Sequence, residues 1–234
     1  MQDVPVMIAR SFITKAKLGV TLLCIATLPP GCKHDGGHHD GAEHSATEGA
    51  LDPGDLLFQD LDCGPLCDAI EAVTEGVDGR DFSHVGMVVR NGDGLAVCEA
   101  IGADVHLTSL AQFNARSAKV LVGHWPDSLR SLAFRASVEA LRLVGTPYDD
   151  AFLPGTEKLY CSELVALTFQ QANGGAPFFD VPPMTFKDPS TGAFFPAWVE
   201  YYAALGQPIP EGVAGCDPGE LSRDVRMLYS DADH

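Results

Sequence analysis

The sequence is poor in basic residues. Of its 234 residues, 15 are lysine or arginine and 32 are aspartate or glutamate, which gives a formal charge of −17. A chain of this sign repels polyphosphate, so we expect no nucleic-acid partner. No internal repeat is visible either. The hydrophobic content of 46% is ample for a buried core, and the length fits one domain preceded by a leader.

The sequence also lacks an apolar run long enough to span a bilayer. The run "LGVTLLCIATL", residues 18 to 28, is too short, and it follows Arg10, Lys15 and Lys17. This pattern is typical of an export signal that is cleaved. The segment "LPPGC", residues 28 to 32, resembles the lipobox of bacterial lipoproteins, in which Cys32 would become the diacylated first residue. The alternative is an ordinary secretory signal.

Residues 33–50, "KHDGGHHDGAEHSATEGA", are polar and glycine-rich and have no apolar period. Such a segment cannot bury enough surface to offset its ordering entropy, so we interpret it as a disordered tether. Its histidines could bind a transition metal loosely, but a solvated linker is the simpler reading. We therefore expect an exported protein, at the periplasmic or cell-envelope face, which a lipid anchor holds to the membrane. Its globular domain would comprise residues 51–234.

The cysteines of this domain do not form an even set. There are five, Cys63, Cys67, Cys98, Cys161 and Cys216. In an oxidising compartment at least one thiol stays unpaired and is a candidate reactive group. Cys63 and Cys67 are four residues apart and could form a disulfide at a turn that enters a helix. A bridge between Cys98 and Cys216, or several buried free thiols, are the alternatives.

Periodicity predicts both strands and helices in the domain. We expect strands within residues 52–60, 83–102, 105–110 and 118–125, and helices over residues 64–76, 128–145 and 161–175. The "NGDG" segment at residues 91 to 94 predicts a hairpin turn, because Asn and Gly tolerate positive φ. The remaining 60 residues or so are expected to form covering loops with one short helix.

Cys161 begins a predicted helix. At that place a thiol meets unsatisfied N–H groups and the positive end of the helix dipole, which favours the thiolate and makes Cys161 a possible nucleophile. Taken alone, a cysteine there is more often a small hydrophobic residue of the core.

The hairpin register supplies partners for this cysteine. If Arg90 opposes Leu95, then Gly86 opposes Glu99, and His84 lies diagonal to Glu99 on the same face. A histidine that a carboxylate orients keeps its other ring nitrogen free as a base, as a cysteine nucleophile requires. Gly86 would leave open space beside the pair. His106 and His124 have no carboxylate paired by register, and we expect them to be surface or packing residues.

Five segments together resemble one family. They are "GDLLFQ" at 54 to 59, "FSHVGMVV" at 82 to 89, "CEAIG" at 98 to 102, "GTPYD" at 145 to 149 and "YCSELV" at 160 to 165. In this order they resemble the permuted papain-like amidases of the YiiX type, relatives of the NlpC-type cell-wall peptidases. The resemblance covers residues 51 to 175 well and the following residues weakly.

The resemblance implies a fold and a set of roles. The fold would be α+β and permuted papain-like, with a small antiparallel sheet or half-barrel packed against the helix that carries the cysteine. Cys161 would be the nucleophile, His84 the base and Glu99 its orienting partner, with backbone N–H groups at the helix start holding the oxyanion. Tyr160 and Gly86 are possible residues of the site lining.

The implied activity is hydrolysis of amide bonds in a peptide, a cell-wall peptide or an acyl-amino acid, and this chemistry requires no metal or organic cofactor. A lipid-directed thiol acyltransferase or phospholipase of the lecithin:retinol acyltransferase type is the alternative. The aromatic clusters "FFDVPPMTF" and "FFPAWVEYY" could form a hydrophobic substrate wall or plain core. A non-catalytic binding lipoprotein is a third possibility.

Overall fold

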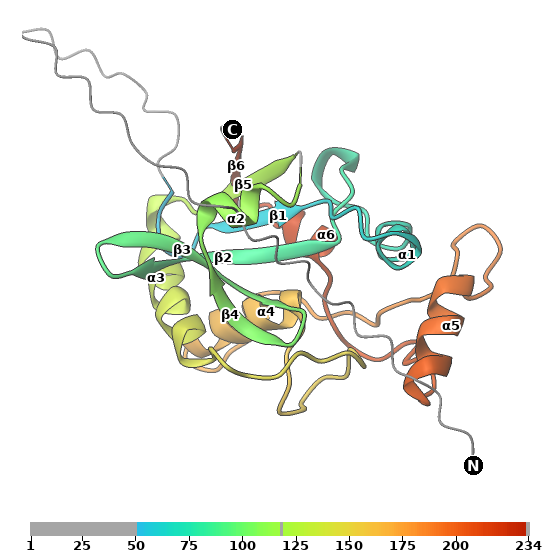
Figure 1. The fold of residues 1–234 in the computed structure, drawn as a ribbon. Coiled ribbons are helices and arrows are strands. Elements are labelled where there is room, and N and C mark those ends of the chain that lie inside the picture. The colour runs from blue at the N-terminus through green and yellow to red at the C-terminus, as the bar shows by residue number, and fades with distance from the viewer. Residues whose placement is uncertain (1–50, 118, 233–234) are drawn as a thin grey trace, which may run out of the picture. The chain divides into compact units, whose positions relative to one another are not determined.

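The computed structural model describes residues 51–117 and 119–232. The predicted leader, Cys32 and the tether of residues 33–50 lie outside the described residues. Helices and strands alternate irregularly along the described chain (Figure 1). Their bounds are β1 Leu56–Gln59, α1 Pro65–Glu71, a 3-10 turn Val77–Gly79, β2 His84–Asn91, β3 Gly94–Ile101, β4 Asp104–Thr108, α2 Leu110–Asn114, β5 Val120–His124, α3 Asp127–Arg142, α4 Cys161–Ala172, α5 Pro196–Leu205, α6 Pro218–Ser222 and β6 Leu228–Asp231.

A six-stranded sheet organises these elements. Its strand order is β4-β3-β2-β1-β5-β6, and all neighbouring strands are antiparallel. The predicted α+β class with an antiparallel sheet is therefore confirmed. Within this sheet, β2 and β3 form the expected hairpin with Arg90 opposite Leu95, and Gly92 takes a positive φ of 58° in its turn.

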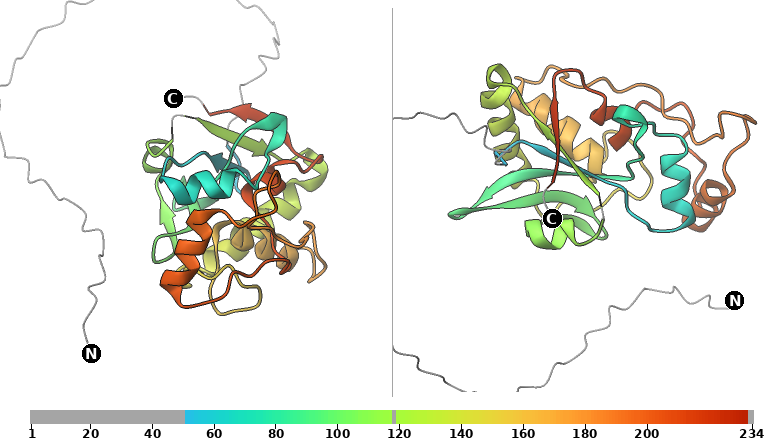
Figure 2. Two further views of the ribbon diagram at one scale, coloured as in Figure 1. Left: turned by 90° about the vertical axis from the view of Figure 1, so that its right-hand side faces the viewer. Right: turned by 90° about the horizontal axis from the view of Figure 1, so that it is seen from above.

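Helices cover both faces of this sheet (Figure 2). α3 and α4 lie on one face, where the odd-numbered residues Val85, Met87 and Val89 of β2 join the main core. On the opposite face the short helix α2 contributes Phe113, which is fully buried against Val88 and its neighbours. Both faces are thus apolar, as the near-continuous hydrophobic run of β2 requires.

The space beside Gly86 is not open, so that expectation was wrong. A side chain on Gly86 would place its Cβ 2.4 Å from Val97 Cγ1 and 2.9 Å from Phe113 Cε2. Phe113 lies on α2 and packs against the hairpin. This is a long-range contact, which the sequence pattern of the hairpin alone could not predict. Gly86 therefore makes room for core packing, and it does not border the site cavity described below.

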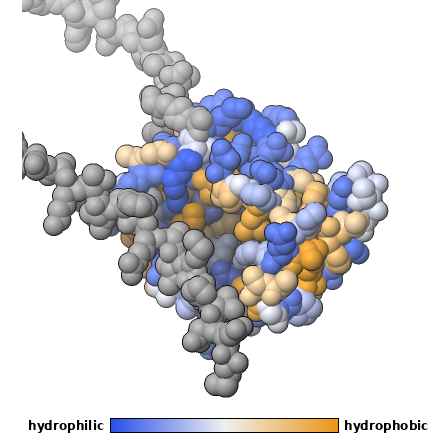
Figure 3. Space-filling view, turned by 45° about the vertical axis from the view of Figure 1, so that its right-hand side comes forward, coloured by the Kyte–Doolittle hydropathy of each residue, from blue (hydrophilic) through white to orange (hydrophobic). Residues whose placement is uncertain are grey.

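The last part of the described chain is more ordered than predicted. Instead of loops with one short helix, it forms α5, α6 and the edge strand β6. Prolines at the first turns of α5 and α6 favour these helix starts, because proline has no N–H to leave unsatisfied. α5 packs beside α1 through Trp198 and Tyr202, and apolar side chains gather on this side of the surface (Figure 3).

The five cysteines of the described residues comprise one disulfide and three free thiols. A disulfide joins Cys63 and Cys67, as their spacing allows, while Cys98, Cys161 and Cys216 are free thiols. The alternative bridge between Cys98 and Cys216 does not form. Cys98 lies on β3 with its Sγ 3.6 Å from the carbonyl oxygen of Ala140 on α3, whereas Cys216 lies beside Tyr160.

The packing at Gly86 leads to a stability prediction. Gly86→Ala should destabilise the fold by about 1–3 kcal/mol, because the new methyl group overlaps Val97 and Phe113. Gly94→Ala in the same hairpin is the matched control. A Cβ added at Gly94 would lie 3.9 Å from the Asn91 carbonyl oxygen, which is ordinary van der Waals contact. Chemical unfolding of both variants measures the difference. Equal midpoints for the two variants would contradict the packing argument.

Candidate active site

Cys161 is the first residue of α4. The preceding residue, Tyr160, has extended backbone, and no side chain caps the helix there. The first intrahelical bond runs from the Leu164 N–H to the Tyr160 carbonyl, 3.0 Å away. The N–H groups at the very start of a helix have no intrahelical acceptor, so this end of α4 presents donors and a partial positive charge beside the thiol.

His84 and Glu99 form a buried pair on neighbouring strands. His84 Nε2 lies 2.7 Å from Glu99 Oε2, and the side chains are 4% and 0% exposed. Because Glu99 occupies Nε2, the nitrogen left for another partner is Nδ1. His84 is the first residue of β2. The preceding residue, Ser83, lines the same cavity as Cys161, so the start of β2 and the start of α4 lie near the same cavity.

The two ionisable groups shift each other in opposite directions. Burial of the imidazole opposes its charged form, but hydrogen bonds and charge from Cys161 and Glu99 outweigh burial and raise the pKa of His84 to about 9. Burial likewise opposes ionisation of Glu99, but His84 and Arg116 outweigh it and lower the pKa of Glu99 to about 2. The pair is therefore ionic over a wide pH range, and Cys161 interacts with its cationic member.

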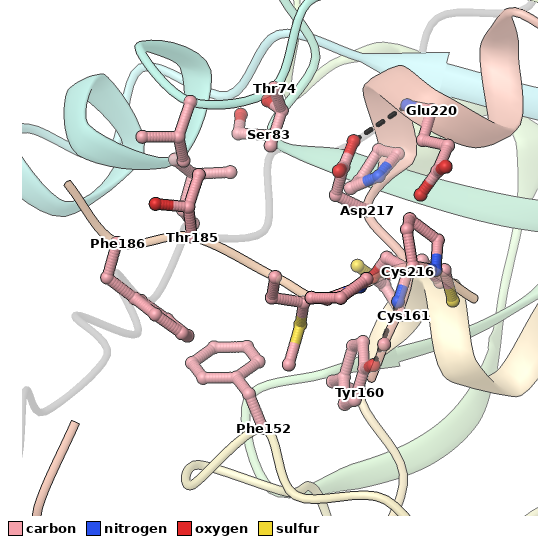
Figure 4. A pocket seen from close by; sticks show the side chains of 18 of the residues that line it. Thr74, Ser83, Phe152, Tyr160, Cys161, Thr185, Phe186, Cys216, Asp217 and Glu220 are labelled. Atoms are coloured by element: carbon pink, nitrogen blue, oxygen red, sulfur yellow. Dashed lines mark hydrogen bonds between the residues drawn. The ribbon is translucent and has the colours of Figure 1, made fainter. Parts of the chain in front are cut away.

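A cavity of about 150 Å³ borders Cys161 (Figure 4). Its walls come from α1, the 148–162 segment, α5 and the two stretches 182–186 and 215–220. Phe152 and Phe186 lie at one end, and Asp217 and Glu220 lie toward Cys216 at the other. Tyr160 lines the cavity as well. No lysine, arginine or histidine is among the described residues that line it.

The segment around Cys216 is hydrogen-bonded to residues at the start of α4. Ser162 Oγ donates to the Cys216 carbonyl at 2.8 Å, and the Cys216 N–H donates to the Tyr160 hydroxyl at 3.4 Å. These two bonds place the wall residues Cys216 and Asp217 directly against the candidate nucleophile. The two aromatic clusters divide between wall and core: Met184, Phe186 and Trp198 line the cavity, while Phe179 packs in the main core.

Several acidic groups around the cavity carry less charge than usual. Burial and the charge of Asp149 raise the pKa of Glu163 to about 7, and burial with Asp217 raises that of Glu220 to about 7. Burial also raises the pKa of Asp217. At neutral pH Glu163 and Glu220 therefore repel a neighbouring thiolate less than fully ionised carboxylates would.

The other two histidines of the described chain do contact carboxylates, contrary to expectation. His106 is the register partner of Glu99 on β4, but its 42% exposed ring has Nδ1 3.1 Å from Asp104 Oδ1. His124 lies between Asp55 and Ser230, with contacts of 2.8 and 2.9 Å. Neither lines the cavity of Cys161. The hairpin register covers only β2 and β3. It could not predict the contacts of His106 and His124 with residues on β4, on β6 and before β1.

Sequence reasoning also missed Arg116 and the cavity wall of residues 182–186 and 215–220. Arg116 Nη2 donates to Glu99 Oε2 at 2.6 Å from a segment that follows α2. A single arginine after a short amphipathic turn has no distinguishing pattern. The wall segments contain proline and aromatic residues without periodicity. Their sequence therefore did not predict that they line the cavity.

The sheet, the cysteine at the start of a helix and the buried His–Glu pair fit the papain-like class of cysteine hydrolases. The description of the matching family model reads "Permuted papain-like amidase enzyme, YaeF/YiiX, C92 family", and the match covers residues 50–224. The chain belongs to this family, and it is a cysteine-dependent, amidase- or peptidase-like enzyme.

Two comparisons with individual proteins agree with the family. The chain is 33% identical over 128 residues to "Uncharacterized protein YiiX" of Escherichia coli strain K12, which covers 52% of this chain and 58% of that protein. The solved structure titled "Crystal structure of metalloprotein yiiX from Escherichia coli O157:H7" has a TM-score of 0.64 and 25% identity, covering 76% of this chain and 95% of that one.

The word metalloprotein in that title belongs to the E. coli protein. Within residues 51–117 and 119–232 of this chain, no group of three or more His, Cys, Asp or Glu side chains could hold a metal ion. The described residues therefore do not fit a metal site. In the same part of the chain, no helix has both the length and the hydrophobicity needed to cross a membrane.

The opposite pKa shifts predict a distinctive dependence of stability on pH. The pKa of Glu99 falls from 4.5 to about 2, so its contribution is present above pH 4.5 and is lost as the pH falls toward 2. The pKa of His84 rises from 6.5 to about 9, so its contribution is complete below pH 6.5 and is lost as the pH rises through 9. The pair should stabilise most between those two ordinary values. Melting temperatures of Glu99→Gln should therefore vary less with pH on both flanks than those of the unmodified protein.

Glu139→Gln is the matched control, because Glu139 forms an ion pair with the exposed Arg142 on α3. It should keep the pH dependence of the unmodified protein, since exposed pairs contribute little. Parallel curves for Glu99→Gln and the unmodified protein would show that the buried pair does not control the pH dependence.

Proposed function

We propose that this enzyme hydrolyses an amide bond through Cys161, His84 and Glu99. The observation that carries the proposal is the buried His84–Glu99 pair, which leaves Nδ1 for Cys161 at the start of α4, beside a cavity. A nucleophile, a base and an orienting carboxylate in this relation are the parts that thiol hydrolysis needs. Nothing in the packing of a structural core requires all three together.

The chemistry follows from these positions. Cys161 Sγ attacks the carbonyl carbon of the amide, and the backbone N–H groups at the start of α4 stabilise the oxyanion. Protonated His84 gives its proton to the amine nitrogen, the C–N bond breaks, and the amine leaves behind a thioester on Cys161. Neutral His84 then takes a proton from water as the hydroxyl attacks the thioester. The carboxylic acid is released and the thiol is restored.

The cavity lining favours a substrate with an apolar part. Phe152, Met184 and Phe186 offer hydrophobic contact, while Asp217 and Glu220 favour a neutral or cationic group over an anionic one. Peptides, cell-wall peptides and acyl-amino acids all satisfy this requirement. The same apolar wall also suits a fatty acyl chain, and this is the observation that favours a second candidate, a lipid-directed thiol acyltransferase or phospholipase.

The catalytic proposal predicts graded losses. Cys161→Ala should abolish turnover and covalent labelling by a thiol-reactive amide or ester probe, because the attacking sulfur is gone. His84→Ala should slow labelling by roughly 10²–10⁴-fold near neutral pH. Glu99→Gln should cost less than either, because it keeps a hydrogen-bonding group but no charge. Competition of the probe with peptide and lipid substrates separates the two candidate functions.

His106→Ala and His124→Ala are the controls for this series. Their ring nitrogens contact Asp104 in one case and Asp55 and Ser230 in the other, and not Glu99, so their loss should leave the labelling rate nearly unchanged. Activity that survives in Cys161→Ala, or a larger loss in either control than in His84→Ala, would refute the assignment.

We also propose that the enzyme is exported and lipid-anchored at Cys32, at the periplasmic or cell-envelope face. The basic start, the short apolar run and "LPPGC" support this, and so does the Cys63–Cys67 disulfide, because such bonds persist in oxidising compartments. The mature protein should begin at Cys32 and carry acyl chains. Intact-mass measurement on membrane extracts tests this. A lipid-free species cut at another residue would contradict it.

A further inference from the structure

Arg116 contacts the same carboxylate oxygen as His84. Its Nη2 lies 2.6 Å from Glu99 Oε2, and His84 Nε2 lies 2.7 Å from that atom. The two nitrogens are therefore no more than about 5 Å apart. Glu99 is fully buried, whereas the Arg116 side chain is 29% exposed, so Arg116 brings a cation from the surface to an interior anion.

The segment that carries Arg116 is firmly held. Phe113, on α2, is buried against the face of the sheet opposite α3 and α4. Its ring centroid lies 6.0 Å from that of His84. Gln59 Nε2 donates to the Phe113 carbonyl at 2.7 Å, and the Arg116 N–H donates to the same oxygen at 3.2 Å. The Arg116 guanidinium also lies 4.9 Å from the Phe113 ring centroid. One short helix thus fixes both a ring beside His84 and a cation on Glu99.

We infer that Arg116 is a positioning residue of the catalytic apparatus, which acts through Glu99 to hold His84 in place and to limit how strongly Glu99 retains the imidazolium proton. The inference rests on the proposed function, because it requires His84 to exchange a proton with Cys161 and the substrate. A buried carboxylate that faced His84 alone would hold the proton more tightly. Arg116 compensates part of that negative charge, so His84 releases the proton to the leaving amine more readily.

The titratable groups that face this pair come from several elements. His106 on β4 is the register partner of Glu99, Cys161 on α4 faces His84, and the Cys98 thiol beside Glu99 is neutral because burial raises its pKa to about 12. His106 is half exposed and lies beside Asp104. Among the described residues, His84 and Arg116 are the two cations that form ion pairs with Glu99.

Removing the charge of Arg116 should shift the pH dependence of the site in one direction. A positive charge favours the deprotonated form of a neighbouring group, so its loss should raise the pH at which His84 releases its proton. The pH profile of Cys161 labelling by iodoacetamide, followed at the level of the Cys161 peptide by mass spectrometry, should show this transition. In Arg116→Gln it should move to higher pH by about half a unit to one unit. A purely structural role would lower the rate without moving the transition.

Two further variants make the test decisive. Arg90→Gln removes the same charge from an exposed position near the hairpin turn and should leave the His84 transition unchanged. Arg116→Lys keeps the charge but not the planar guanidinium, so it should hold the transition near its original pH while the labelling rate falls about 3- to 10-fold. Near-ultraviolet circular dichroism gives the folded fraction, and rates are compared per folded molecule.

Each outcome has a meaning. A transition of folded Arg116→Gln that coincides with that of Arg90→Gln would overturn the inference. If Arg116→Gln does not fold, Arg116→Lys decides: a rate equal to that of the unmodified protein, or a transition displaced upward, would overturn it. Failure of the proposed function looks different, because the unmodified protein would then label at Cys161 with a profile that His84→Ala leaves unchanged.

Discussion

The described fold depends on a carboxylate that has no contact with solvent. Glu99 lies in the middle of β3 with a fully buried side chain, and a lone charge in that place would be strongly unfavourable. It is tolerated because His84 on the neighbouring strand and Arg116 after α2 both contact its Oε2. Strand register, the position of α2 and the orientation of His84 are therefore coupled through one side chain. Displacing any of the three would leave a charge unpaired.

This coupling explains which parts of the fold the sequence could predict. The β2–β3 hairpin is local: "NGDG" determines the turn, the turn determines the register, and the register brings Glu99 beside His84. The start of α4 at Cys161 is local as well, since it follows from periodicity. Those two local features contain the three predicted catalytic residues. No long-range contact had to be known to identify them.

Other features depend on contacts between segments far apart in the sequence. Phe113 occupies the space next to Gly86, His106 pairs with Glu99 in the register, and β6 joins β5, yet none of these partners has a pattern that specifies the other. The cavity wall is the clearest case. Cys216 reaches α4 through hydrogen bonds to Ser162 and Tyr160, 54 and 56 residues away. For "FFDVPPMTF" and "FFPAWVEYY", composition indicated burial but could not divide the residues between wall and core.

The electrostatics of the cavity resolve an apparent conflict with the composition. A chain with a formal charge of −17 surrounds a nucleophile that must itself become an anion. Around Cys161, burial raises the pKa of Glu163 and of Glu220 to about 7, so near neutral pH each is ionised only part of the time. Glu99 stays fully ionised, but its charge is compensated by His84 and Arg116. The site thus keeps a cationic imidazole beside the sulfur in a protein whose net charge would otherwise oppose the thiolate.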